Sequence, residues 1–253
     1  MLMYQRLFIG NKRINLEEVD STNSYMKQLI FVNDNTIEGL VVVAKNQFEG
    51  RGQQKNIWES EKGKNLIFSI FLKPNIEVGN QFLLSKLVSL GIVDFLLDKE
   101  LDNVKIKWPN DIYIKDEKLS GILIENSIKG NKIYNSIVGI GLNVNQINFP
   151  SAVCNPTSLK ILKGLNLDIE ECLNELLFFI EKRYLMLKSG KIDLINKNYL
   201  EYLYWLNQPR KFLVSNEIVS GIIIGVYVTG KLQLKVNDKI EAFDLKEIEF
   251  LEK

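Results

Sequence analysis

Strand-like alternation in the middle of the chain constrains the fold more than any other feature. VKIKW (104–108) alternates apolar and polar side chains and stops at Pro109, as a strand does before a rigid turn. DIYIKDEKLSGILIE (111–125) repeats the alternation on both sides of Asp116-Glu117, which predicts a hairpin. Because strands joined by so short a turn are antiparallel, the sequence predicts an antiparallel sheet here.

The turn sorts the hairpin's side chains onto two faces. With Asp116-Glu117 as the two-residue turn, Lys115 would lie opposite Lys118. A polar face would then hold Asp111, Tyr113, Lys115, Lys118 and Ser120, and a core face would hold Ile112, Ile114, Leu119 and Leu123 with Gly121. The polar face could support a charged ligand, or it could be a solvated hairpin surface.

Helices and strands are intermixed before residue 207. Buried strands are predicted at 39–46, 65–74 and 132–145. Helices are predicted at 82–101, 168–190 and about 194–206, and within 19–31, where Ser21 or Thr22 can cap the first turn. Because hairpin-like neighbours dominate, we expect an α+β fold and not a doubly wound parallel sheet.

The pattern of residues along the sequence changes after Asn207-Gln208-Pro209. The remaining residues form short alternating segments separated by Gly, Asn and Asp turns. This pattern predicts a small all-β domain of SH3-like size. We therefore expect two domains, 1–206 and 207–253.

Composition excludes several kinds of chemistry. The chain has no histidine, which removes Ser-His-Asp and Cys-His nucleophile systems and His-ligated metals. Cys154 and Cys172 have no metal or redox spacing and are expected to be reduced thiols. The net charge of +1 argues against a general nucleic-acid or membrane-surface role, and we see no signal peptide and no apolar run long enough to cross a bilayer. These features predict a cytoplasmic protein.

Arg51 lies between two glycines in EGRGQQKN (49–56). Glycine lets the backbone approach a ligand closely, and arginine can bind phosphate or carboxylate with two N–H groups. The segment is therefore either an anion-binding loop or a surface turn. It lacks the spacing of a phosphate-binding Walker loop, and the Gly pair in GIGLNVN (139–145) opens no helix, so it is not a dinucleotide fingerprint.

Several motifs together resemble one family. STN (21–23), NQFEGRGQ (46–53), Trp58 with KGKNLIFS (62–69), KWPNDIYIKDEKLSGIL (107–123) and GIGLNVN (139–145) occur in this order at sensible intervals. The combination resembles the biotin protein ligases, from about Ser21 through the C-terminal strands. KWPND followed by Lys and G-I-L is its most specific part.

The resemblance implies a fold and an activity. The expected fold is a catalytic domain related to class II aminoacyl-tRNA synthetases with a small SH3-like C-terminal domain. The expected enzyme activates biotin with ATP and Mg²⁺ to biotinyl-5′-AMP. It then transfers biotin to one lysine of the carrier domain of acetyl-CoA carboxylase or a related acyl-CoA carboxylase.

The resemblance also implies roles for individual residues. Arg51 would bind the phosphate and the biotin carboxylate, Lys118 would offset charge where acyl group and phosphate meet, and Asp111 would orient or deprotonate the carrier lysine. The remaining biotin-binding residues would be Ser21, Thr22, Gln47, Gly50 and Gly121. The nucleotide-binding residues would be Gln53, Trp58, Lys107, Asn110 and Asn143. Metal ligands stay unassigned.

The glycine–arginine loop departs from the family pattern G-R-G-R-x-G-R. Gln53 replaces the second Arg, Lys55 replaces a Gly and Asn56 replaces the last Arg. Two fixed cationic groups are lost, because Gln cannot neutralise phosphate as Arg does. A variant that compensates elsewhere, a ligase that holds its adenylate loosely, and a catalytically weak biotin-binding regulator are the three interpretations.

The type of ligase and its assembly are less constrained by the sequence. A lipoate or octanoate ligase or transferase would share the fold. Some family members carry an N-terminal DNA-binding domain, and the position of STN at residue 21 leads us to expect a stand-alone ligase without operator binding. The chain could be a monomer or a homodimer.

Overall fold

A mixed eight-stranded sheet forms the centre of the computed structural model, which describes residues 4–33, 35–53, 56–150 and 155–251. The strand order is β1-β2-β3-β8-β7-β6-β5, with β4 paired to β8; only the β1–β2 pair is parallel in this described part. The strands are β1 (Arg13–Leu16), β2 (Val41–Ala44), β3 (Leu66–Leu72), β4 (Ile76–Glu77), β5 (Val104–Lys107), β6 (Asp111–Ile114), β7 (Glu117–Lys129) and β8 (Lys132–Leu142).

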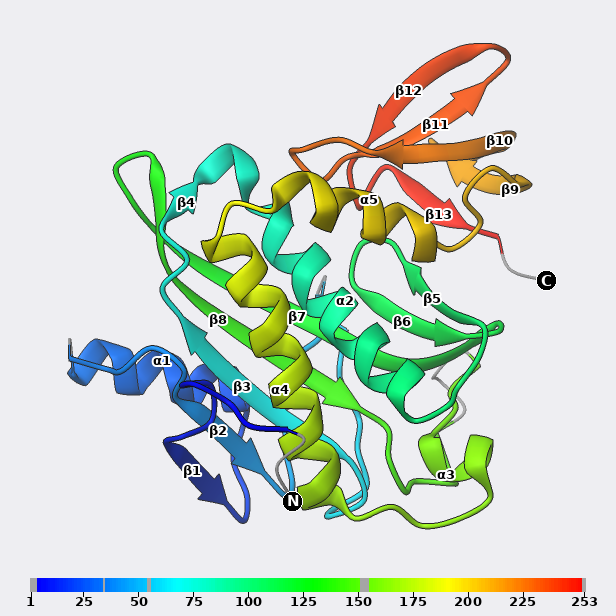
Figure 1. The fold of residues 1–253 in the computed structure, drawn as a ribbon. Coiled ribbons are helices and arrows are strands. Elements are labelled where there is room, and N and C mark those ends of the chain that lie inside the picture. Colours follow the sequence, from blue (N-terminus) through cyan, green and yellow to red (C-terminus); the bar gives the residue numbers. More distant parts are fainter. Residues whose placement is uncertain (1–3, 34, 54–55, 151–154, 252–253) are drawn as a thin grey trace.

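Helices cover the two faces of this sheet unequally. The helices are α1 (Thr22–Val32), α2 (Phe82–Asp98), α3 (Leu159–Lys163), α4 (Ile169–Lys188) and α5 (Ile192–Tyr202). Figure 1 shows α2 and α4 crossing the same face, where their apolar side chains share the main core with alternate residues of β3, β7 and β8. α1 packs on the opposite face through Met26, against Val42, Phe71 and Ile137. The rest of that face stays open for a site.

A second sheet follows at the C-terminus. It contains β9 (Pro209–Val214), β10 (Glu217–Val226), β11 (Leu232–Val236), β12 (Lys239–Phe243) and β13 (Ile248–Phe250) in the order β12-β11-β10-β9-β13. Figure 1 shows it beyond the end of the main sheet formed by β5 and β6. The predicted α+β class and the small C-terminal β unit are confirmed; the domain boundary at residue 207 stays a prediction.

Two expectations about helices are corrected by the structure. Ser21 occupies the N-cap position of α1, but its side chain makes no capping hydrogen bond. Val78–Asp98, which is α2 with the short turn before it, is long and apolar enough to cross a membrane, although we expected no such run. Most of this stretch is buried inside the protein, because α2 lies between the sheet and the helices α4 and α5. Its apolarity therefore belongs to a core helix.

The hairpin has a different register from the predicted one. Ile114 pairs with Glu117, so the turn residues are Lys115 and Asp116, and Lys115 has a positive φ of 57°. A β-bulge then separates the Ile112–Ser120 and Tyr113–Lys118 pairs, with Leu119 as the extra residue. The bulge places Gly121 and Leu123 on the face of Asp111 and Lys118, and the fully buried Ser120 on the other face, which reverses all three predictions.

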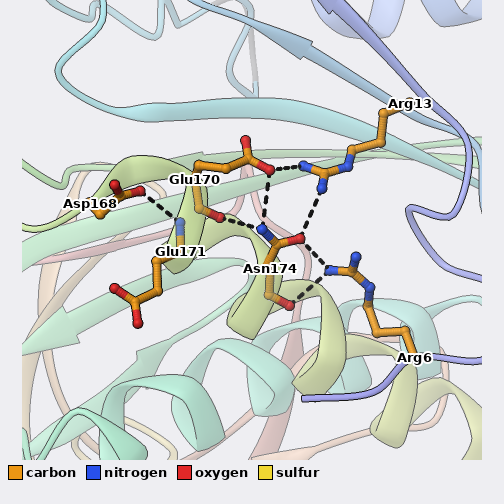
Figure 2. Close-up of polar contacts among 6 residues, drawn as sticks. All are labelled: Arg6, Arg13, Asp168, Glu170, Glu171 and Asn174. Atoms are coloured by element: carbon orange, nitrogen blue, oxygen red, sulfur yellow. Dashed lines mark hydrogen bonds and ion pairs between the residues drawn. The ribbon is translucent and has the colours of Figure 1, made fainter. Parts of the chain in front are cut away.

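Polar contacts fix the N-terminal segment to α4. Figure 2 shows Arg6 and Arg13 converging on Asn174, with Arg13 also donating to Glu170 at 2.5 Å. Further along the helix, the buried Glu181 carboxylate accepts hydrogen bonds from the backbone N–H groups of residues 7–9 at 2.5–2.8 Å. Charge-assisted bonds of this kind stabilise a segment that has little regular structure.

Cys172, on the same helix, is buried in the core, and burial raises the pKa of its thiol to about 11. It is therefore an inert thiol, as expected. The second expected thiol, Cys154, lies outside the described residues.

Lys86 provides a test of the core around α2. It is 4% exposed, its Nζ donates to Asn196 Oδ1 at 2.8 Å, and burial lowers its pKa from 10.5 to about 8. Between these pH values the unfolded chain binds more protons at this residue than the folded protein, so the free energy of unfolding rises with pH. We compare the free energy of unfolding of the wild type with that of Lys86→Met. From pH 8 to pH 10.5, the wild-type free energy minus the variant's should rise by up to about 3 kcal/mol.

Urea unfolding of both proteins across this range measures the difference. A constant difference would contradict the assigned cost of burying the Lys86 charge.

Candidate active site

A cavity of about 950 Å³ opens on the sheet face that α1 leaves uncovered. Its walls come from the N-terminus of α1, the described segments 47–53 and 56–58, strands β3 and β5–β8, and the C-terminal residues 213–216 and 245–251. The two sheets are also joined here by Trp108 Nε1, which donates to the Gly230 carbonyl at 2.8 Å. Segments from the whole length of the chain therefore meet at one site.

The base of the cavity is a patch of sheet without side chains. Gly121 of β7 pairs directly with Gly141 of β8, and the Trp58 indole lies across both. A Cβ at Gly141 would overlap Trp58 Cε2, so no larger residue fits there with this ring position. The buried Trp58 Nε1 has no hydrogen-bond partner among the described residues, so a ligand acceptor entering the cavity could satisfy it.

Lys118 and Asp111 form an ion pair at the cavity wall. Lys118 Nζ lies 2.6 Å from Asp111 Oδ2, and both side chains are about three-quarters buried. The backbone of Lys118 is held by residues 155–157, since its N–H donates to the Asn155 carbonyl at 2.7 Å and its carbonyl accepts from Thr157 N at 2.9 Å. This pairing fixes the strand where the bulge turns Lys118 toward the cavity.

Arg51 also lines the cavity. Its Nη2 lies 2.7 Å from Glu125 Oε2, and its loop is closed by the bonds Trp58 N to Gly50 O (2.9 Å) and Gly52 N to Asn56 O (2.7 Å). A Cβ at Gly50 would overlap the Trp58 carbonyl oxygen, so Gly50 is needed for loop closure. Gly50 is absent from the described lining residues, whereas Gln53 and Asn56, where the family pattern has arginine, are present. Lys55, the third substituted position, lies outside the described residues.

The residues before and within the first turn of α1 form a polar end to the cavity. Ser21, Thr22 and Gln47 all line it, and Gln47 Oε1 accepts a hydrogen bond from Thr22 N at 2.7 Å. Behind them Ser69 Oγ lies 2.7 Å from Thr22 Oγ1 and 2.6 Å from Asn23 Oδ1. The three residues predicted for the biotin head group are thus brought together.

The predicted nucleotide residues are only partly assembled. Lys107 lines the cavity, with its Nζ 3.2 Å from the Tyr113 hydroxyl and over the Phe250 ring. Asn110 also lines it, but its Nδ2 donates to the Ile122 carbonyl and its own carbonyl accepts from Ile122 N, which is a turn-stabilising role. Asn143 is outside the described cavity lining and donates to the Thr157 carbonyl at 2.9 Å.

Three contributors were not identified from the sequence. Asn23, Ser69 and Glu125 link the polar end of the cavity to Arg51 through hydrogen bonds. A signal existed for Ser69, because it is the only polar residue inside the apolar run LIFSIFL. Asn23 belongs to the recognised STN motif, whereas the contact of Glu125 with Arg51 joins residues 74 positions apart and no local pattern predicts it.

The donor set does not form a protein cage for a metal. Within the described residues no three His, Cys, Asp or Glu side chains are grouped to hold an ion. Mg²⁺ is commonly bound through substrate phosphates with one or two carboxylates. A magnesium ion at this site would therefore need ligands from a bound nucleotide's phosphates.

Comparisons with known proteins agree with this geometry. A model described as the biotin/lipoate A/B protein ligase family matches residues 16–143, half of the chain. The bifunctional ligase/repressor BirA of Bacillus subtilis is 29% identical over 244 residues, covering 95% of this chain and 74% of that protein. Biotin–protein ligase 1, chloroplastic, of Arabidopsis thaliana is 32% identical over 200 residues, covering 74% of this chain and 52% of that protein.

A solved structure extends the similarity over nearly the full chain. The biotin protein ligase from Aquifex aeolicus in complex with biotin and ATP has a TM-score of 0.80 to this protein at 27% identity, covering 96% of this chain and 100% of that one. The match includes the C-terminal sheet. The chain has the biotin protein ligase fold and belongs to the biotin/lipoate A/B protein ligase family.

Proposed function

We propose that this protein activates biotin with ATP to biotinyl-5′-AMP and transfers biotin to a lysine of a carrier domain. One observation carries the proposal. A single cavity joins a polar end at Thr22 and Gln47, a base of paired glycines, Gly121 and Gly141, under the Trp58 indole, and two lining cations, Arg51 and Lys118. A biotin head group, its aliphatic tail and an acyl phosphate need these three environments in that order.

The first step joins two anions. A carboxylate oxygen of biotin attacks the α-phosphorus of ATP, the bond to the bridging oxygen breaks, and pyrophosphate leaves. Because both reactants are negatively charged, cations fixed around the reacting atoms lower the barrier. Arg51 and Lys118 serve this role: Lys118 exchanges its partner Asp111 for the ligand anion, whereas Arg51 keeps Glu125 on one N–H and offers its other N–H groups to the anion.

In the second step the carrier lysine amine attacks the acyl carbon and AMP leaves. The lysine loses a proton, and Asp111 is the carboxylate positioned to accept it once Lys118 turns to the phosphate. A positioned base of this kind commonly contributes about 10²–10⁴-fold to a rate. Trp58 and Lys107 would contact the nucleotide, with magnesium bound to its phosphates.

Gln53 and Asn56 leave the loop with fewer cations than the family pattern has. Both line the cavity, so their amides can donate hydrogen bonds to phosphate without neutralising it. Lys107 and Lys118 retain two cations on the other walls. We propose that the protein is an active ligase that holds its adenylate less tightly than a chain with arginine at both positions.

The carrier is proposed to be the biotin domain of acetyl-CoA carboxylase or a related acyl-CoA carboxylase, in the cytoplasm. The protein could act as a monomer or a homodimer. A lipoate or octanoate ligase of the same family is the second candidate, because the matched family model includes lipoate ligases. ATP–pyrophosphate exchange should depend on biotin and be absent with lipoate or octanoate; exchange with lipoate alone would reverse the assignment.

Replacing either cavity cation tests the adenylation step. Arg51→Ala and Lys118→Ala should each lower biotin-dependent pyrophosphate exchange by at least about 100-fold, because each removes a charge that stabilises the transition state. Lys132→Ala, at the far end of β8, is the matched control and should retain wild-type exchange. If the wild-type protein binds biotin but shows no pyrophosphate exchange, the result would instead support the catalytically weak biotin-binding regulator.

Asp111→Asn tests the transfer step separately. With purified biotinyl-5′-AMP and a carrier domain, single-turnover transfer should slow by at least about 100-fold, since the amide cannot accept the proton. Pyrophosphate exchange should fall much less. Equal losses in both reactions would show that Asp111 acts by positioning Lys118 and does not serve the carrier lysine.

A further inference from the structure

A continuous chain of hydrogen bonds runs behind the cavity. It begins at the Thr22 hydroxyl, 2.7 Å from Ser69 Oγ, and Ser69 Oγ is 2.6 Å from Asn23 Oδ1. Asn23 Nδ2 then donates to Glu125 Oε2 at 2.8 Å, and the same oxygen accepts from Arg51 Nη2 at 2.7 Å. Thr22, Asn23 and Ser69 are each less than 5% exposed, so water does not compete for these bonds.

The acceptors in this chain decide where each proton lies. A carboxylate only accepts hydrogen bonds, so the Asn23 NH₂ group must face Glu125 and its Oδ1 must face Ser69. Ser69 has one proton, which it donates to that Oδ1. The Thr22 hydroxyl therefore donates its own proton to Ser69 and presents its lone pairs to the cavity. The cavity thus offers an acceptor to a ligand N–H group at this point.

Glycine makes room for this arrangement. Ser69 of β3 pairs with Gly139 of β8, and a Cβ at Gly139 would overlap Asn23 Oδ1. The Asn23 side chain thus occupies the space that any other residue at 139 would fill. From the first turn of α1 it reaches across β8 to Glu125 on β7.

At its other end the chain of hydrogen bonds reaches Arg51. One guanidinium N–H is used on Glu125, and the other four have no partner among the described residues. Glu125 itself is outside the described cavity lining, whereas Arg51 is part of it. The carboxylate thus holds one N–H of the guanidinium and leaves the other N–H groups available to a ligand in the cavity.

We infer that Glu125 is a positioning residue that sets both ends of the site. Through Asn23 and Ser69 it fixes the Thr22 hydroxyl as an acceptor for a ureido N–H, and directly it aims Arg51 at the acyl phosphate. The inference rests on the proposed function, since it assigns these two ends to one ligand.

Biotin methyl ester tests the Thr22 end alone, because it keeps the ureido group and lacks the carboxylate that Arg51 would bind. By calorimetry, Glu125→Ala and Ser69→Ala should each raise its Kd about three- to tenfold, the value of one neutral hydrogen bond. Glu125→Gln should remain within about twofold of wild type, because its amide oxygen still accepts from Asn23. The control Glu117→Ala, on the same strand as Glu125, should leave this Kd unchanged.

The half-life of bound biotinyl-5′-AMP tests the Arg51 end. Glu125→Ala and Glu125→Gln should both shorten it about three- to tenfold, because the neutral amide oxygen of Gln holds a guanidinium less strongly than a carboxylate does. In an Arg51→Ala background the same substitutions should have no further effect, because the group that they position is gone. Thermal unfolding identifies any variant that fails to fold. If Glu125→Ala fails, Ser69→Ala still tests the Thr22 end and Glu125→Gln still tests the Arg51 end.

The inference would be overturned if Glu125→Ala and Ser69→Ala bound the ester as tightly as the wild type. It would also be overturned if substituting Glu125 shortened the adenylate lifetime as much in the Arg51→Ala background as in the wild type. Failure of the wild type itself to bind biotin would instead refute the proposed function, so the two failures are distinguishable.

Discussion

The register between β7 and β8 is the constraint on which the site depends. It sets Gly121 opposite Gly141 and Leu123 opposite Gly139 on one face, while the alternate residues Ile122 and Ile140 enter the core under α2 and α4. A shift by one residue would exchange these faces, placing isoleucines in the cavity and glycines in the core. The core packing that holds the sheet together therefore also fixes the glycine patch that the Trp58 indole covers.

The β-bulge at Leu119 shifts the register between β6 and β7 next to Lys118. Without the extra residue, strict alternation would place Lys118 and Gly121 on opposite faces. With it, both face the cavity beside Asp111, and residues 155–157 pair with the backbone of Lys118 from outside the sheet. A local irregularity in one strand thus brings a cation next to a surface cleared of side chains, which is what an acyl phosphate beside an aliphatic tail requires.

Much of the fold could be predicted from the sequence, because periodic apolar patterns report which face of an element is buried. The strands 66–72 and 132–142 and the helices 82–98 and 169–188 lie within their predicted ranges. The position of the turn could not be predicted, because Asp116-Glu117 and Lys115-Asp116 are equally short turns. The bulge at Leu119 was therefore missed as well. The family resemblance identified Arg51, Lys118 and Thr22, but the links through Ser69 and Glu125 join residues 46 to 102 positions apart and depend on tertiary packing.

The central claim is that one acyl-adenylate spans this cavity from Thr22 to Lys118. A crystal structure with a non-hydrolysable biotinyl-adenylate, in which an acidic acyl sulfamide replaces the acyl phosphate link, tests it most directly. The account predicts the ureido group at Thr22 and Gln47, the tail over Gly121, and the anionic linkage between Arg51 and Lys118. A ligand bound in the reverse direction, or a linkage that contacts neither cation, would contradict it.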